Sequence, residues 1–424
     1  MPVRWRDAMD RALYGPGGFF VSGSGPADHF RTSVHASPAF AAALLRLVEQ
    51  VDAALDHPPV LSVVDVGAGR GELLRALSAA LGVAGEPARS GRSGLIPPRA
   101  GSPATPTPSA APRPSPSSGP PSAGPAPSAP VALARRVRLT AVELAPRPEG
   151  LPGQIAWRSD IPEGITGVLV ATEWLDNVPL DVAVPADDGW RYLLVDPTSG
   201  AEALGDPVSP DDAAWLTTWW PLPAEDAPGF LPRTVADGVG STGSGFRAAR
   251  PAEGSSLTAR SGSGRPEPPT GVRAEIGRTR DEAWADAVRH VDRGLALAVD
   301  YGHLRGGRPV DGTLTGYRAG RQVPPVPDGT RDVTAHVAVD SVASAGGRVA
   351  RCAYDLVSQR EALRALGADG GRPALSLAAS DPVGYVRALA AASAMAELTD
   401  PAGLGGHWWL RQPVGVDPER FMAR

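Results

Sequence analysis

The chain contains no lysine, and all 41 of its basic residues are arginines. This excludes a Schiff-base lysine, a lysine general base and the phosphate-binding loop that ends in Gly-Lys-Ser/Thr. Cys352 is the single cysteine, so internal disulfides and zinc sites built on several cysteines are excluded as well. No run of about 18 apolar residues occurs, and the first ten residues are too polar for a signal peptide. We therefore expect a cytoplasmic protein without a membrane span.

A strong excess of one charge is also missing, because 46 acidic residues face 41 basic ones and leave a net charge of −5. Nucleic-acid-binding domains are usually net basic, so we expect no nucleic-acid partner. Apolar residues make up 42% of the 424 residues, which is enough for a globular core. The sequence leaves the oligomeric state open.

Glycine and proline, with 50 and 46 copies, gather in two stretches of low complexity. Residues 84–130 consist mainly of proline, serine, alanine and glycine, and residues 236–270 are rich in glycine, serine and arginine. Such segments bury too little surface to offset the entropy lost on ordering them. We expect both to be disordered inserts in an otherwise folded chain.

Outside the inserts, three segments have the spacing typical of helices. The first begins at residue 38, and the second spans residues 72–81. The third spans residues 279–293, where Thr279 and Glu282 are spaced as a capping box.

Short runs rich in apolar and β-branched residues predict strands between and after these helices. The expected strands span residues 60–66, 137–143, 167–172, 190–195 and 295–300. Alternating strands and helices are typical of a mostly parallel sheet with helices on both faces. The predicted class is therefore α/β, with a Rossmann-like sheet.

Three glycines at alternate positions follow the first strand directly: Gly67, Gly69 and Gly71. Glycine lets the backbone turn sharply and lets a ligand lie against the peptide. The spacing is GxGxG and not the dinucleotide GxGxxG, because Glu72 stands three positions after Gly69. S-adenosylmethionine (SAM) suits this turn, since Asp65 can hold its ammonium and backbone amides its carboxylate. A purely structural turn is the alternative.

Two acidic residues, one at the end of the second strand and one in the segment before the third, suit the rest of the cofactor. Glu143 follows the second strand and can accept hydrogen bonds from both hydroxyls of a ribose. With the insert subtracted, it lies about 25 residues after Gly71, close to the ~20 expected of such a unit. Asp160 follows later and can accept from the adenine amino group while an apolar neighbour covers the ring. The alternatives are a surface carboxylate at the strand end and a solvated loop aspartate.

The third strand leads into Glu173, Asp176 and Asn177, the only asparagine in the chain. In an open parallel sheet the ligand crevice lies beyond the carboxyl ends of the strands, which is where these side chains fall. We expect them to be catalytic, orienting and desolvating an incoming nucleophile and accepting its proton. The alternative is that Glu173 and Asp176 cap the following helix. No metal is predicted.

The ordered set of motifs resembles the MidA family of SAM-dependent methyltransferases. The resemblance covers nearly all of the chain outside the two inserts. Its segments are residues 14–20, 28–33, 67–71, 173–179, 271–276, 298–302, 312–314 with Tyr317, 332–337 and 358–363. The family's glycine turn corresponds to residues 67–71, and its acidic position after the turn corresponds to Glu143.

The resemblance implies a class I methyltransferase fold with SAM as the cofactor. Mitochondrial members of the family are complex I assembly factors regarded as protein arginine methyltransferases. A protein substrate follows from this, with a respiratory complex I subunit as a partner. If arginine is the acceptor, Glu173 and Asp176 would neutralise and orient its guanidinium.

The segment around the third strand end departs from the family pattern. Thr172 stands where the family usually has asparagine, and Asn177 stands where it usually has alanine. Two alternatives therefore stay open: a small-molecule methyltransferase of the same fold, and a SAM-binding assembly factor that has lost catalysis.

We expect one methyltransferase domain with additions. Residues 1–58 form an N-terminal helical segment, and residues 59–340 form the SAM-binding core, which holds both inserts. A substrate-side subdomain occupies about residues 185–235 of that core. Residues 341–424 supply C-terminal helices and a last strand.

Overall fold

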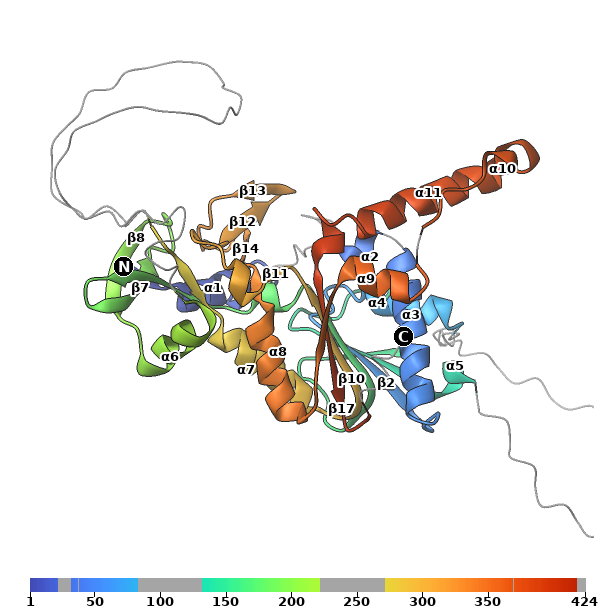
Figure 1. The fold of residues 1–424 in the computed structure, drawn as a ribbon, viewed down its shortest axis with the longest axis horizontal. Helices are drawn as coiled ribbons and strands as arrows, with labels where there is room; N and C mark the ends of the chain where they lie inside the picture. Colours follow the sequence, from blue (N-terminus) through green and yellow to red (C-terminus); the bar gives the residue numbers. More distant parts are fainter. Residues whose placement is uncertain (22–31, 37, 83–131, 222–270, 369, 418–424) are drawn as a thin grey trace, which may run out of the picture.

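A computed structural model describes residues 1–21, 32–36, 38–82, 132–221, 271–368 and 370–417. Both expected inserts, 84–130 and 236–270, lie outside the described residues. The described chain forms a large sheet covered by helices and a second lobe of smaller sheets, at the left in Figure 1. Among these residues no helix is long and apolar enough to cross a membrane.

The large sheet has seven strands in the order β16-β17-β10-β5-β2-β3-β4. Their bounds are β2 (Leu61–Val66), β3 (Val137–Val142), β4 (Ile155–Arg158), β5 (Ile165–Thr172), β10 (Val291–Asp300), β16 (Asp355–Ser358) and β17 (Trp408–Val414). Neighbouring strands are parallel from β4 to β10, whereas β17 runs antiparallel to both β10 and β16. The fold is therefore a mixed one with five neighbouring parallel strands, four of which were expected. The fifth, β4, was not predicted, and the strand expected at residues 190–195 lies instead in the antiparallel sheet of the second lobe.

Both faces of the large sheet are buried, which explains why β2 reads as an almost continuous apolar run. Leu61 and Val63 of β2 point to a core shared with α3 (Pro38–Ala54), α4 (Glu72–Ala80) and α9 (Gln359–Ala365). Val64 and Val66 point to a core on the opposite face, shared with α7 (Arg278–Arg289) and α8 (Val339–Ala350). The short helices α2 (Ser33–Ala36) and α5 (Leu133–Arg136) complete this part.

The second lobe is built around an antiparallel sheet with the path β1-β7-β6-β9, and β8 pairs with β7. The bounds are β1 (Val3–Arg4), β6 (Asp181–Ala186), β7 (Gly189–Val195), β8 (Glu202–Pro207) and β9 (Ala274–Ile276). Helix α1 (Trp5–Tyr14) covers this sheet with Trp5, Met9 and Leu13, and α6 (Pro210–Trp219) packs beside β9. The lobe thus draws on more of the chain than residues 185–235, and α1 and α3 of the N-terminal segment belong to different cores.

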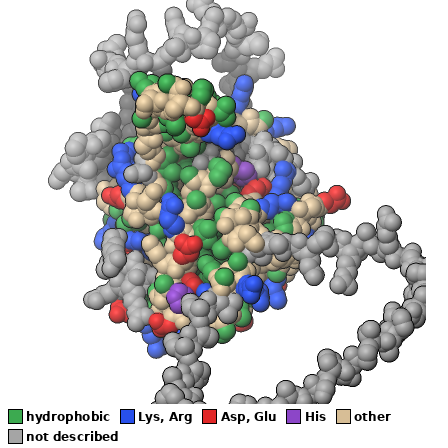
Figure 2. Space-filling view, turned by 90° about the vertical axis from the view of Figure 1, so that its right-hand side faces the viewer, with side chains coloured by type: hydrophobic (Ala, Val, Ile, Leu, Met, Phe, Trp, Pro, Cys, Tyr) green, Lys and Arg blue, Asp and Glu red, His purple; other side chains and the backbone are tan. Residues whose placement is uncertain are grey.

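Smaller elements join the lobe to the large sheet. They are β11 (Gly302–His303), β12 (Thr315–Arg318), β13 (Arg321–Val323), β14 (Asp332–Thr334), β15 (Val337–Ala338) and the 3-10 helices η2 (Leu175–Asn177), η3 (Arg305–Gly307) and η4 (Leu404–Gly406). Strands β13, β12 and β14 form an antiparallel sheet, and β11 pairs in parallel with β15. Helices α10 (Leu375–Ser380) and α11 (Pro382–Leu398) extend from the body at the upper right of Figure 1. Leu375 of α10 and Val383 of α11 are exposed. Figure 2 shows hydrophobic side chains gathered over the upper part of the face that it presents.

The predicted capping box of the third helix is wrong. Helix α7 begins at Arg278, after Gly277, and no side chain caps its first turn. The Thr279 hydroxyl instead donates to the carbonyl of Pro179 at 2.6 Å, so it ties the helix to the segment after β5. The helix also ends earlier than expected, at Arg289, because the chain from Val291 is already strand β10.

Candidate functional site

Polar side chains meet where the strand order of the large sheet reverses, beyond the ends of β2, β3 and β5. Strands β3 and β4 lie on one side of β2, and the chain then returns to place β5 on its other side. A crevice opens at such a reversal, and ligands of open α/β sheets bind there. Asp65 lies in β2, Glu143 follows β3 and Glu173 follows β5, so three predicted site residues come together at this edge.

Each glycine of the predicted turn has a positive φ, at 70° for Gly67, 57° for Gly69 and 76° for Gly71. A Cβ on Gly67 would lie 2.9 Å from the Trp174 ring, and one on Gly71 would lie 2.8 Å from Leu151. A Cβ on Gly69 would approach no atom more closely than 3.5 Å. Two glycines are therefore required by packing, whereas Gly69 leaves the backbone open to a ligand.

The backbone amides of the turn already have partners. Gly69 N donates to Glu143 Oε2 at 3.0 Å, and Arg70 N donates to Glu72 Oε2 at 3.0 Å. The other amides of the turn donate to backbone carbonyls. The amides can hold the carboxylate of SAM, as expected, only if a glutamate side chain first turns away. Only the amides of Gly69 and Arg70 are bonded to glutamate side chains, so these two are the candidates.

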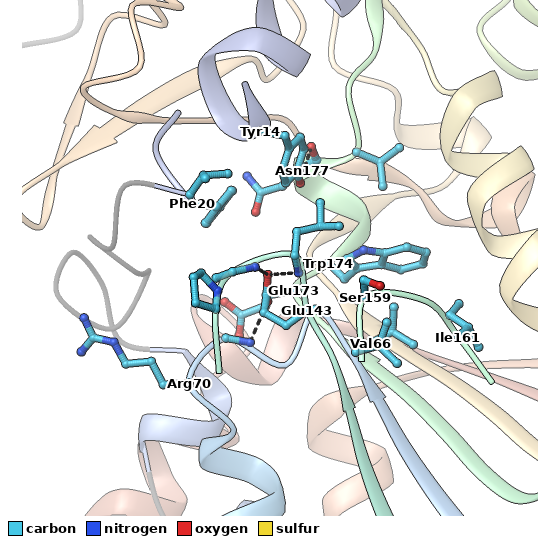
Figure 3. Close-up of a pocket in the computed structure, with 18 of the residues that line it drawn as sticks. Tyr14, Phe20, Val66, Arg70, Glu143, Ser159, Ile161, Glu173, Trp174 and Asn177 are labelled. Carbon is cyan, nitrogen blue, oxygen red and sulfur yellow. Dashed lines mark hydrogen bonds between the residues drawn. The ribbon is translucent and has the colours of Figure 1, made fainter. Parts of the chain in front are cut away.

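A large cavity of about 620 Å³ lies over the turn (Figure 3). This volume is in the range of small-molecule sites, which are mostly apolar with a few polar groups. One part of its wall consists of Glu143 together with Ser159 and Ile161, and another consists of Tyr14 and Phe20. The remaining lining residues are Val21, Val66, Gly67, Gly69, Arg70, Val142, Leu144, Ala145, Pro146, Pro148, Glu173, Trp174, Asn177, Val178 and Pro179. The Arg70 side chain extends away from this group in Figure 3.

A small hollow of about 70 Å³ adjoins the large cavity. Gly67, Glu173 and Asn177 line both spaces, whereas Asp65 and Asp176 line only the hollow. Asp65 is 2% exposed, and its Oδ1 atom has no hydrogen-bond partner among the described residues. Burial raises the pKa of Asp65 well above its ordinary value, and the nearby charges of Glu72 and Glu143 raise it further.

Glu173 stands at the junction of the two spaces. Its backbone is in the left-handed region, with φ of 51°, which is rare for a residue that is not glycine. Its amide donates to Val299 O at 2.8 Å, and its Oε1 accepts from the Ser33 amide at 3.1 Å. Burial, followed by the charge of Asp176, raises the pKa of Glu173 to about 8. Strained backbone and a strongly shifted pKa together are typical of functional sites.

Asp176 and Asn177 are held by residues from the segment after β10 and from β14. Asp176 Oδ2 accepts hydrogen bonds from the hydroxyls of Tyr301 and Thr334, whereas its Oδ1 is buried without a partner in the described chain. Asn177 Nδ2 donates to Asp332 Oδ1 at 2.7 Å. Neither acid caps a following helix, because η2 has no side-chain cap. That alternative is therefore wrong.

Two further buried residues fix the backbone of η2. Asp300 Oδ2 accepts from the amides of Leu175 and Asp176, at 3.0 and 3.3 Å. Arg280, which is 1% exposed, donates to the carbonyls of Asp176, Val178, Ala335 and His336. The pKa of Asp300 is raised well above its ordinary value, by burial first and then by the charge of Asp176.

Asp160 is the predicted site residue that the structure places apart from the others. It is exposed, its Oδ2 accepts from the Ser159 hydroxyl at 2.8 Å, and it lines neither cavity. Its neighbours Ser159 and Ile161 do line the large cavity. Its proposed contact with adenine stays a prediction.

Sequence reasoning missed several residues of the site. Tyr14 and Phe20 entered only as parts of a resembling motif, and yet they form one wall of the large cavity. Asp332 likewise entered only as part of a resembling motif, and Arg280 carried no signal, because one arginine among 41 looks like a surface residue. Their roles depend on contacts between segments far apart in the chain.

Residues 132–356 match the model of a protein family described as "Putative S-adenosyl-L-methionine-dependent methyltransferase". The chain belongs to this family. Two solved structures from Burkholderia thailandensis have the same fold, each at 22% sequence identity and each covering all of this chain. One is a "likely methyl transferase" bound to S-adenosyl-homocysteine, with a TM-score of 0.63 and 91% of its own chain covered. The other is an uncharacterized protein of the same superfamily, with a TM-score of 0.62 and 90% covered. No curated protein matches the chain.

The residues of the two cavities fit the SAM on which the family depends. The large cavity offers the Glu143 carboxylate for a ribose and an apolar wall for an adenine. The small hollow offers Asp65 for an ammonium, because its Oδ1 atom has no hydrogen-bond partner among the described residues. Gly69 lines both cavities, and because it has no side chain a ligand can lie against its backbone. Glu143 now accepts from the amides of Gly69 and Leu144, so these bonds would be exchanged for ribose hydroxyls.

Proposed function

We propose that this chain transfers the methyl group of SAM to a side-chain nitrogen of a protein, with arginine as the acceptor. The observation that carries the proposal is the position of Glu173, which lines both cavities. Within the described chain, its carboxyl accepts only from the Ser33 amide, and no arginine or histidine pairs with it. A buried carboxyl group without a cation of its own favours a substrate that brings one.

When bound, SAM supplies an electrophilic methyl group on a positively charged sulfur. The residues of the chain then have to align the acceptor, exclude water and take up a proton. With a pKa of about 8, Glu173 exists in both protonation states near neutral pH. As a carboxylate it can orient a guanidinium, and it can accept the proton that the nitrogen loses on methylation.

An aromatic wall faces the same space. The rings of Tyr14 and Phe20 stack at 5.7 Å, and the Tyr14 hydroxyl donates to the carbonyl of Asn177 at 3.3 Å. A planar cation is attracted to the face of such rings when it is shielded from water. This wall supports a guanidinium acceptor beside Glu173.

The class I architecture and the MidA assignment are part of the proposal. The strand order and the single reversed strand β17 support a class I sheet. The resemblance in ordered motifs supports the MidA family, from which a respiratory complex I subunit is the proposed protein partner. Asp176 and Asn177 complete the proposed catalytic group, with Asp176 acting from the small hollow.

A small-molecule acceptor is the second candidate. It is favoured by the apolar residues Phe20, Val21, Val178 and Pro179, which line the acceptor side of the large cavity. A closed apolar pocket selects small ligands more readily than a protein loop.

Incubation of the chain with radiolabelled SAM and a lysate of its host cells separates these functions. We expect label in a protein band, which acid hydrolysis assigns to methylarginine, and loss of that label in Glu173→Gln. Label in small molecules would establish the second candidate. The chain could also be an assembly factor that binds SAM without catalysis. Calorimetry with SAM tests this, because such a chain would bind SAM and label nothing.

A further inference from the structure

We infer that Gln359 is a positioning residue for Glu173, on which it acts through Ser33. This role rests on the proposed function, in which Glu173 orients the acceptor. Gln359 is the first residue of α9, it is 0% exposed, and it lines neither cavity. It therefore does not reach a molecule bound in either cavity, and any effect on the site passes through the residues that it contacts.

Both ends of the Gln359 side-chain amide have fixed partners. Its Oε1 accepts from the indole Nε1 of Trp409 at 3.3 Å, and its Nε2 donates to the carbonyl oxygen of Leu398 at 3.2 Å. An indole nitrogen can only donate and a carbonyl oxygen can only accept, so these two partners determine which way the amide points. An amide oxygen has two lone pairs, which leaves Oε1 able to accept from a second donor.

That second donor comes from α2. The Ser33 hydroxyl donates to Gln359 Oε1 at 3.2 Å, and Ser33 is fully buried. Helix α2 has only four residues, too few to be stable by its own hydrogen bonds. Its place is therefore set by tertiary contacts, and the bond between Ser33 and Gln359 joins it to α9, β17 and the end of α11.

The same serine presents its backbone amide to the site. This amide donates to Glu173 Oε1 at 3.1 Å, and it is the one donor to the Glu173 carboxyl in the described chain. Hydroxyl and amide belong to a single small residue, so a shift of Ser33 away from Gln359 also moves the amide. Glu173 would then lose the contact that orients its carboxyl group between the two cavities.

The Ser33 amide also favours the charged form of Glu173. Burial raises the pKa of this carboxyl group, the hydrogen bond from Ser33 lowers it, and the charge of Asp176 raises it, to about 8 overall. Without the amide the pKa should rise further, because a hydrogen bond to the carboxylate stabilises the charged form. Less of the carboxylate that orients a cation would then be present near neutral pH.

Other charged groups also lie around Glu173. The acids Asp176, Asp300 and Asp332 interact with its carboxyl group, and Asp65, Glu72, His35 and Arg70 line the small hollow that it borders. The variants below change none of these groups. A shift in the titration of Glu173 therefore reports on the Ser33 amide.

Two variants break the connection at its two ends. Gln359→Met keeps the length of the side chain and removes the amide, and Ser33→Ala removes only the hydroxyl. Gln412→Met is the matched control, because Gln412 of β17 is also fully buried and donates to backbone carbonyls outside the site, those of Cys352 and Pro413. Melting curves check that the variants fold. Ser33→Ala, the smaller change, decides by itself if Gln359→Met does not fold.

NMR on the full chain, labelled in the carboxyl carbon of its glutamates, follows the titration of Glu173, whose signal is the one missing from Glu173→Gln. We expect the pKa of Glu173 to be higher than in wild type in Gln359→Met and in Ser33→Ala, and unchanged in Gln412→Met. Transfer of label from radiolabelled SAM to protein should fall roughly 10- to 100-fold in the first two, because a small misplacement costs this much. The double variant should match either single variant, since both remove the same bond.

Gln359 has a structural role only, and the inference is overturned, if Gln359→Met and Gln412→Met both lower the melting temperature and neither changes the titration of Glu173. Additive effects of Gln359→Met and Ser33→Ala in the double variant would overturn it as well. In both cases label on protein with the wild-type chain leaves the proposed function standing. If the wild-type chain labels no protein, the proposed function fails, and the titration still decides whether Gln359 positions Glu173.

Discussion

At the scale of single residues, Glu173 combines a φ of 51° with a buried carboxyl group whose pKa is raised to about 8. The folded chain holds this proton more tightly than the unfolded chain, where the ordinary value is 4.5. The stabilising contribution is therefore complete below about pH 4.5 and is lost as the pH rises through 8. We expect Glu173→Gln to be more stable than wild type at pH 9, by roughly 1–3 kcal/mol, and to show no such gain at pH 5. Urea unfolding at the two pH values measures this.

The same substitution at Glu282, an exposed residue of α7, serves as the control and should change stability equally at both pH values. An equal gain for Glu173→Gln at pH 5 and pH 9 would contradict the assigned ionisation. Stability gained with methyl transfer lost is the pattern expected of a residue kept for function.

Gly69 allows a second test at this scale. Gly69→Arg places a side chain where the large cavity now leaves the backbone open, so we expect binding of S-adenosyl-homocysteine to be lost. Gly367→Arg is the matched control, because its φ of 72° imposes the same backbone strain and no atom lies within 4 Å of its Cβ position. Both variants should lose about 1–2 kcal/mol of stability, and only the first should lose the ligand in a calorimetric titration. Equal binding by both would contradict the assigned cavity.

At the scale of elements, Arg280 connects α7 to the segment of η2 and to the segment that follows β14. Arg280 is 1% exposed, and its guanidinium donates to four carbonyls, those of residues 176, 178, 335 and 336. We expect Arg280→Met to cost about 3 kcal/mol or more, because four carbonyl groups lose a donor away from water. Arg280→Lys should rescue little, since an ammonium cannot reproduce the planar set of donors. Arg289→Met at the exposed end of α7 should be nearly neutral in the same chemical unfolding measurement.

Sequence predicts the parts of this site that are local in the chain. Gly67 and Gly69 follow directly from a strand, a turn and a helix in succession, and Glu173 follows from the end of β5. The hydrogen bonds that hold the Asp176 carboxylate cannot be predicted in this way. Their donors, Tyr301 and Thr334, lie 125 and 158 positions away and reach Asp176 only through the order of the strands. Spacing along the chain identifies candidate groups, whereas their partners are determined by tertiary packing.

At the scale of the whole molecule, the same distinction holds for the fold. The helical spacing from residue 38 and the apolar run of β2 identify α3 and the centre of the large sheet correctly. The antiparallel β17 and the pairing of β1 with β7 are not encoded locally, since β1 pairs with β7 across a stretch of chain that contains β2, β3, β4 and β5 of the large sheet. Pairings of such separation depend on which surfaces are left to bury after the local elements have formed.

Two histidines where the lobe meets the large sheet lead to a prediction for the whole molecule. His303 packs against Trp220 at 5.2 Å, and His407 packs against Tyr301 at 5.5 Å. Burial lowers the pKa of His303 to about 3, with help from the charge of Arg308, and lowers that of His407 to about 4.

The unfolded chain binds these protons near pH 6.5, so the contribution of each histidine to stability is complete above 6.5 and is lost as the pH falls towards 4 and 3. We expect the unfolding free energy of His407→Gln, compared with wild type, to improve by roughly 1–2 kcal/mol between pH 7 and pH 5. The pH 7 value is the internal control, because it contains only the packing cost of the substitution. Parallel pH curves for the two proteins would show that His407 is not buried as a neutral group. They would also contradict its packing against Tyr301, between the end of β10 and the start of β17.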